Sequence, residues 1–94
     1  MILERAEITA KPGQAGGLLG ALRGQGLALL QGVPGCHSAR AGGGVETPDK
    51  VILLVEWESL AAHEAFKKMP EYAVLGGLFG PFAAGGAVEH FVMD

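Results

Sequence analysis

Apolar and polar positions alternate along the first ten residues, "MILERAEITA". One side of an extended chain carries Ile2, Ala6 and Ile8, and the other carries Arg5, Glu7 and Thr9. A period of two is typical of a strand with one buried face. The sequence therefore predicts a half-buried strand over residues 2–10, which the "KPG" turn at residues 11–13 ends.

The periodicity changes to that of an amphipathic helix between residues 14 and 32. The apolar side chains that fall on its predicted inner face are Ala15, Leu18, Leu19, Leu22 and Leu29. Several glycines interrupt this segment, and each costs up to about 1 kcal/mol relative to alanine, so packing must hold the helix. Gly16, Gly20 and Gly24 line up on the opposite face, either as a flat surface for another backbone or simply where no side chain is needed.

The rest of the chain predicts three strands and two helical segments. We expect a short strand at 36–41, a turn at 42–49, a strand at 51–58, a helix at 60–69, a further helical turn or two at 71–80, and a last strand at 87–94. Ser59 is a good N-cap for the first of these helices, and Pro70 ends it. The strand "VILLVEWE" begins apolar on both faces, which predicts that it is covered on both sides.

The predicted order of elements is β-α-β-β-α-β, with a short extra helix before the last strand. This order is typical of an α+β, ferredoxin-like fold, in which helices cover one face of a four-stranded antiparallel sheet. The other face of such a sheet is bare in a monomer. Because the central strand is apolar on both sides, we expect a partner sheet, most simply that of a second copy in a homodimer.

Composition narrows the class of protein further. The chain of 94 residues is expected to form one domain, residues 1–94, and its single cysteine, Cys36, excludes an internal disulfide. The net charge of −3 and the scattered basic residues argue against binding to nucleic acid or to an anionic membrane. No apolar run is long enough to span a bilayer, and the charged N-terminal segment does not resemble a signal peptide, so we expect a cytoplasmic protein.

Several motifs in order resemble the antibiotic biosynthesis monooxygenase family of dimeric α/β barrels. They are "KPG" before the first helix, "PGC" before the second strand, "VEWESLAAHEAF", "MPEYAVLGGLFGPF" and a final "EHF". The resemblance covers nearly the whole chain and implies two sheets that close into a barrel across a dimer, with a pocket between helices and sheet in each subunit. Some members of the family oxidise phenols or quinols with O₂ and no cofactor, and others cleave haem.

The haem-degrading branch of the family is matched only at Trp57. Its haem-ligating histidine corresponds to Gly76 here, and the sequence contains no asparagine, although that branch relies on one. Haem binding or degradation is therefore the disfavoured expectation.

Trp57 and His63 are the candidate catalytic residues. Trp57 either forms a wall of the pocket against a flat substrate or plugs the core at the end of a strand. His63 is placed at the edge of its helix's inner face, where it is either a general base for a phenol or a surface histidine. The expected lining of the pocket is Phe66, Tyr72, Leu75 and Phe79, although these residues could equally cap an ordinary core.

The remaining histidines and the cysteine carry weaker signals. His90 is expected to have a structural role, with Glu7 or Thr9 as its partner, and neither His37 nor Cys36 lies in a recognisable motif. The spacing of the histidine and cysteine residues does not indicate a metal site. The leading expectation is a cofactor-independent monooxygenase acting on a small aromatic or quinol. The alternative is a non-catalytic dimeric module that binds a small ligand or regulates a partner.

Overall fold

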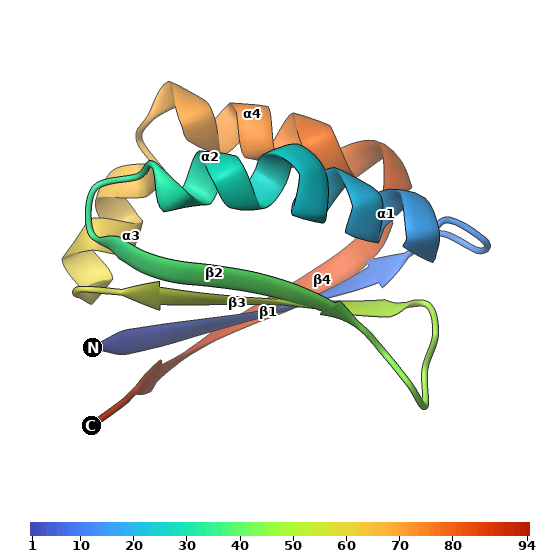
Figure 1. Cartoon of the computed structure of the whole chain (residues 1–94), viewed down its shortest axis with the longest axis horizontal. Coiled ribbons are helices and arrows are strands. Elements are labelled where there is room, and N and C mark those ends of the chain that lie inside the picture. The colour runs from blue at the N-terminus through green and yellow to red at the C-terminus, as the bar shows by residue number, and fades with distance from the viewer.

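Four antiparallel strands form one sheet in the order β2-β3-β1-β4 (Figure 1). The computed structural model covers residues 1–94. Its elements are β1 (Ile2–Ala10), α1 (Ala15–Ala21), the π-helical η1 (Leu22–Gly26), α2 (Leu27–Gln31), β2 (Cys36–Gly43), β3 (Lys50–Trp57), α3 (Leu60–Phe66), α4 (Pro70–Phe79), the 3₁₀ turn η2 (Gly80–Phe82) and β4 (Ala83–Val92). This order confirms the predicted α+β, ferredoxin-like fold.

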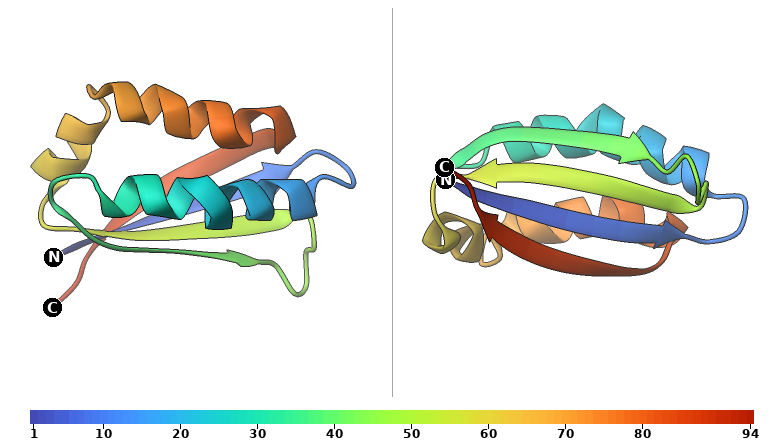
Figure 2. Two further views of the ribbon diagram at one scale, coloured as in Figure 1. Left: turned by 45° about the horizontal axis from the view of Figure 1, so that its top comes forward. Right: turned by 90° about the horizontal axis from the view of Figure 1, so that it is seen from below.

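All of the helices lie on the same side of the sheet. Figure 1 shows α1, α2 and α4 stretched across one face, with α3 at the end of the sheet where both chain termini lie. The view from below shows four uncovered strands (Figure 2, right). The sheet therefore has an inner face under the helices and an open face.

The first helix is continuous but contains a π-helical segment in its middle, and this segment changes which leucine is buried. The buried positions are Leu18, Leu22, Gly26 and Leu30, each four residues apart. In a regular α-helix a four-residue spacing drifts around the axis, and the wider π turn takes up this drift. Leu29, which was predicted to face the core, packs against it but is only partly buried, and the fully buried leucine is the next one, Leu30.

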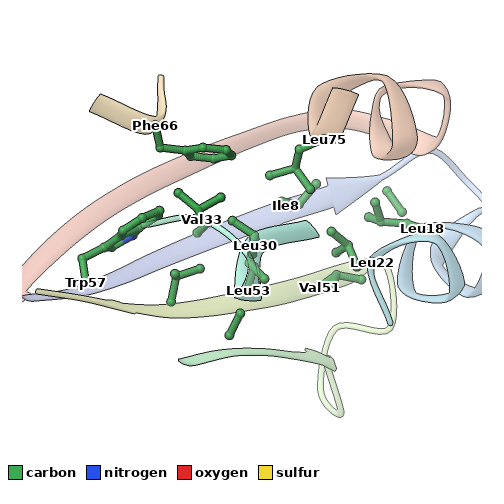
Figure 3. Close-up of a cluster of buried hydrophobic side chains, with 14 residues drawn as sticks. Ile8, Leu18, Leu22, Leu30, Val33, Val51, Leu53, Trp57, Phe66 and Leu75 are labelled. Atoms are coloured by element: carbon green, nitrogen blue, oxygen red, sulfur yellow. The ribbon is translucent and has the colours of Figure 1, made fainter. Parts of the chain in front are cut away.

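Strand β3 alternates as its sequence predicts. Val51, Leu53, Val55 and Trp57 are buried under the helices, with exposed fractions between 0% and 4%. Ile52 and Leu54 point to the open face and are half-buried, because no element of this chain covers that face. Side chains far apart in the sequence meet over this strand, from Leu18 at one end of the core to Trp57 and Phe66 at the other (Figure 3).

The segment after β3 begins as predicted and ends earlier. The Ser59 hydroxyl oxygen accepts a hydrogen bond from the backbone N–H of Ala62 at 3.2 Å, which confirms the N-cap. Helix α3 ends at Phe66 rather than at residue 69, and Pro70 occupies the first turn of α4, where its missing N–H costs nothing.

Strand β4 begins at Ala83 rather than at residue 87. Its first residues, "AAGG", have no alternating pattern that would predict a strand. They pair because β1 is long enough to receive them: Ala10 lies opposite Ala83, and Ile8 lies opposite Gly86. A Cβ atom at Gly86 would lie 3.0 Å from the carbonyl oxygen of Glu7, so a residue without a side chain suits this close approach.

None of the helices has the length and apolar character that a membrane crossing requires.

Candidate functional site

A cavity of about 560 Å³ lies between the inner face of the sheet and the helices α3 and α4. Twenty residues line it, and 13 of them are hydrophobic. Its floor includes Ala6 and Ile8 from β1 and Leu53 and Val55 from β3. A cavity of this size and composition is suited to a small, largely apolar molecule.

The helical side of the cavity is built from the predicted aromatic and aliphatic residues. Phe66, Tyr72, Leu75 and Phe79 all line it. The rings of Phe66 and Tyr72 meet edge to face, with centroids 5.5 Å apart and an angle of 87° between their planes. Tyr72 remains 45% exposed, so it stands near the mouth of the cavity, while Phe66 and Leu75 are buried.

One end of this apolar cavity is polar because Glu4 and His63 both line it. Glu4 points inward from β1 at a position where the alternation requires a core residue, and it is only 8% exposed. Its Oε1 atom accepts a hydrogen bond of 2.9 Å from the indole N–H of Trp57 and lies 3.3 Å from Nε2 of His63. The residues that flank Glu4 on this face, Ile2 and Ala6, make it the one charged group in an apolar row.

Glu4 keeps one oxygen without a partner in the protein. Its Oε2 atom makes no hydrogen bond or ion pair, whereas Oε1 contacts two groups. No fully buried side-chain nitrogen or oxygen in the chain lacks a hydrogen-bond partner. The unpartnered Oε2 atom is therefore not fully buried, and on a residue that lines the cavity it can accept a hydrogen bond from a ligand.

His63 is held between Glu4 and His90. The Nδ1 atom of His63 lies 2.7 Å from Nε2 of His90, and the two ring centroids are 4.9 Å apart. His63 is only 4% exposed, so its expected place at the edge of the helix face is wrong: the rings of Trp57 and His90 pack against it. The expected partners of His90 are also wrong, because the strand register places Glu4, not Glu7 or Thr9, opposite it.

Trp57 lies behind His63 and does not line the cavity. It has no exposed surface, and it is absent from the cavity wall that we expected it to form. Its indole ring stacks on the imidazole of His63 and packs against Phe66, with centroid distances of 4.9 and 5.7 Å. The structure therefore brings the two candidate residues into direct contact, but only His63 reaches the cavity.

Burial lowers the pKa of His63 below its ordinary value of 6.5. Desolvation disfavours the charged imidazolium, and the charge of Glu4 opposes this effect. Lys67 and His90 lower the pKa further, while Glu64 raises it. The ring is consequently biased towards its neutral form, in which one nitrogen carries a proton and the other accepts a hydrogen bond.

The other candidates lie apart from the cavity. His37 is exposed on β2, and Cys36 is half-buried, with its thiol donating to the carbonyl oxygen of Ser38 at 3.7 Å. Burial raises the pKa of the Cys36 thiol, which disfavours a reactive thiolate. No group of three or more His, Cys, Asp or Glu side chains is arranged to hold a metal ion.

Sequence reasoning missed Glu4, although the sequence carries a signal for it. In the alternating strand "ILERAEITA", Glu4 shares its side with Ile2, Ala6 and Ile8. A charged residue on the buried face of a strand needs a partner, and it is therefore a candidate for a functional site.

Residues 1–75 match the model of the family described as antibiotic biosynthesis monooxygenase. No curated protein sequence matches the chain. Among solved structures, the fold is similar to that of a "putative antibiotic biosynthesis monooxygenase" from Bordetella bronchiseptica, with a TM-score of 0.92 and 25% identity over 99% of this chain and 96% of that one.

Two further solved structures are similar at lower identity. A "putative antibiotic biosynthesis monooxygenase" from Deinococcus radiodurans has a TM-score of 0.84 and 13% identity over 100% of this chain and 93% of that one. A conserved protein of unknown function from Bacteroides thetaiotaomicron, described as a "possible oxidoreductase", has a TM-score of 0.82 and 16% identity over 96% and 94% of the two chains. At these identities the likeness shows the fold alone.

Proposed function

Because the chain belongs to the antibiotic biosynthesis monooxygenase family, we propose that it is a cofactor-independent monooxygenase for a small aromatic or quinol substrate. The observation that carries this proposal is the cavity of about 560 Å³, apolar along its length, with the Glu4 carboxylate and the His63 imidazole at one end. An aromatic ring fits between the sheet and the Phe66–Tyr72 pair. Its hydroxyl group then meets the one polar end of the cavity.

The reaction begins with loss of a proton at this polar end. The substrate is a phenol whose keto tautomer carries a ring CH₂ group, and its anion gives one electron to O₂. The resulting radical and superoxide combine in a new C–O bond. Cleavage of the O–O bond then leaves a carbonyl on the ring and releases water, which takes up both hydrogens of the CH₂ group.

The protein supplies position and electrostatics for these steps. Phe66, Tyr72, Leu75 and Phe79 hold the ring and exclude water, so that the anion forms next to fixed hydrogen-bonding groups. Trp57 acts through His63: its stacked indole fixes the plane of the imidazole, and its N–H holds Glu4. We place the enzyme in the cytoplasm, which suits a single free cysteine.

Haem is a poor fit to this cavity. The histidine that ligates iron in the haem-degrading branch is replaced by Gly76, which lines the cavity without a side chain. The only histidine that reaches the cavity is His63, and both of its ring nitrogens already face a partner in the protein. No histidine in the cavity is therefore free to act as an axial ligand.

A homodimer formed through the open face of the sheet completes the proposal. This face carries Leu3, Ile52, Leu54 and Phe91 from three neighbouring strands, and Phe91 is 42% exposed. Charged residues lie among them in pairs of opposite sign, such as Arg5 with Glu7 at 2.9 Å. An apolar surface bordered by charge pairs is typical of a contact between two copies of one chain.

A non-catalytic ligand-binding module is the second candidate. The observation that favours it is that neither ring nitrogen of His63 is free to take a proton. Reaction under ¹⁸O₂ separates the two functions. A monooxygenase places one labelled atom in the product carbonyl, whereas a binding module releases its aromatic ligand unchanged.

A further inference from the structure

His63 is held by polar groups from two neighbouring strands. Glu4 on β1 and His90 on β4 lie directly opposite each other in the strand register, so their side chains stand on the same face of the sheet. His63 enters between them from α3. Its Nε2 atom lies 3.3 Å from Oε1 of Glu4, and its Nδ1 atom lies 2.7 Å from Nε2 of His90.

The carboxylate of Glu4 favours a proton on the Nε2 atom of His63, which lies 3.3 Å from its Oε1 atom. Oε1 is an acceptor, because the indole N–H of Trp57 can only donate to it. A bare Nε2 facing this oxygen would bring two lone pairs together, so the proton of neutral His63 belongs on Nε2. Nδ1 is then bare and accepts a hydrogen bond from the Nε2–H of His90.

In this tautomer His63 has no site for a proton from the substrate, whereas Glu4 has one. The Oε2 atom of Glu4 has no partner in the protein and is not fully buried, and Glu4 lines the cavity. We propose that Glu4 is the proton acceptor of the reaction, and that His90 is a positioning residue that holds His63 in the tautomer that supports the carboxylate. This inference rests on the proposed monooxygenase function and changes the role that the sequence suggested for His63.

The proton-transfer step needs no group other than Glu4 to accept the proton. The O–H bond of the substrate breaks, its electron pair stays on the substrate oxygen, and a new O–H bond forms at Oε2. The other charged groups that influence His63 are Glu64 on α3 and Lys67, the residue that follows this helix. These two form an ion pair of 3.1 Å, so their charges largely cancel and leave the Glu4–His63 pair to govern the site.

The first test is the protonation of the two rings, measured by ¹⁵N NMR on the labelled full-length protein at pH 7.5. We expect a proton on Nε2 of both His63 and His90. His90→Gln keeps an N–H donor and should preserve the His63 spectrum, whereas His90→Leu removes the donor and should mix the tautomers. A proton on Nδ1 of wild-type His63 would overturn the proposal, whether or not a substrate is known.

The second test compares the rates of oxygen consumption of two amide variants. Glu4→Gln cannot accept the proton and should lose at least about 100-fold in kcat. His63→Gln can still donate to Glu4 and accept from His90, so it should stay within about tenfold of wild type. If His63→Gln lost more of kcat than Glu4→Gln, His63 and not Glu4 would be the base. If the wild-type protein oxidises no substrate, the proposed function is contradicted. The NMR spectra of the two rings would still test whether His90 holds His63 in the proposed tautomer.

The pH dependence of kcat/KM separates positioning by His90 from a purely structural role. His90→Gln should match the wild-type profile, because the variant restores the hydrogen bond to His63. His90→Leu should lower kcat by about tenfold with little change in KM, in the range that is usual for loss of an orienting partner. An equal loss in both variants, or a change in thermal stability alone, would contradict the assigned role.

Discussion

The indole ring of Trp57 lies flat against the imidazole of His63, with 4.9 Å between ring centroids and 12° between ring planes. The same indole donates its N–H to Glu4, so one buried side chain orients both polar groups of the cavity. Stacking and hydrogen bonding together fix this pair more tightly than either contact does alone. Trp57 therefore supports these two polar groups from behind and does not line the cavity.

Replacing Trp57 with phenylalanine tests this supporting role. The variant keeps an aromatic ring for stacking but removes the indole N–H that donates to the Oε1 atom of Glu4. We expect the free energy of unfolding to fall by about 1–3 kcal/mol. Urea unfolding followed by circular dichroism measures it, since the variant has no tryptophan for fluorescence. Unchanged stability would show that the indole–carboxylate bond contributes nothing.

The lowered pKa of His63 predicts that acid weakens the fold. The unfolded chain binds a proton at this residue near pH 6.5, whereas the folded chain resists it because the ring is buried. The stabilisation is complete above about pH 6.5 and is lost as the pH falls towards the folded-state pKa. Urea unfolding between pH 5 and 8 measures how the free energy of unfolding changes with pH. This change should be smaller in His63→Gln, because glutamine does not titrate. Identical slopes for the two proteins would contradict this origin.

Gly76 offers a way to fill the cavity without disturbing the fold. It lines the cavity, and a Cβ atom added there would meet no other atom within 4 Å. Gly76→Leu should therefore fold at least as stably as wild type, because leucine favours a helix by about 1 kcal/mol over glycine. It should also weaken binding of 2-naphthol, measured by fluorescence, by at least about tenfold.

The matched control for this substitution is Gly77→Leu. Gly77 is on the same helix and is equally open to an added side chain, but it does not line the cavity. We expect it to bind 2-naphthol as wild type does. If both variants bound the probe equally well, the ligand site would lie elsewhere.

Gly35 is the one glycine that combines a positive φ angle with a steric clash for an added side chain. Its φ angle is +83°, and an added Cβ atom would lie 2.6 Å from the Cβ atom of Ala62 on α3. Gly35→Ala should lower the free energy of unfolding by about 1–3 kcal/mol. Gly32→Ala is the control, because Gly32 has a helical φ of −88° and only ordinary contacts. Thermal melting compares them, and equal melting temperatures would argue against strain at Gly35.

Leu54 tests the proposed contact through the open face of the sheet. It lies on that face between Arg5 and Arg40 in the strand register, so Leu54→Glu gains opposite charges in a single chain. In a dimer the same carboxylate would be buried against a second sheet at a high cost. We expect the variant to sediment as a 9.7 kDa monomer, and wild type at twice this mass. Val74→Glu, at an exposed position on α4, should leave the dimer intact, and a monomeric wild-type protein would contradict the proposal.

The fold follows from sequence patterns because local alternation decides most of it. The alternating residues from Val51 to Trp57 specify strand β3. The Ser59 cap specifies the start of α3. The π-helical segment was not predictable, since it depends on how Leu30 packs against the sheet. The start of β4 was missed because its pairing follows from the length of β1 and not from its own residues.

Some of the residues that gather at the cavity could be predicted from the sequence, but their arrangement could not. Trp57 and His63 could be singled out from their types and positions, and the apolar residues after Pro70 indicated a pocket. The contact between His63 and His90 depends on strand register and on the tilt of α3, and neither is encoded in local spacing. Glu4 was the detectable omission, as an acidic residue in an apolar row.

The most direct test of the proposed function is oxygen uptake by the purified, metal-stripped protein with a panel of quinols and anthrone-like phenols. The proposal predicts uptake with product formed in step, strongly reduced by Glu4→Gln and reduced less by Trp57→Phe. The folded Gly77→Leu variant should react as wild type does. A well-folded protein that consumes no oxygen with any member of a broad panel would contradict a monooxygenase and favour a binding module.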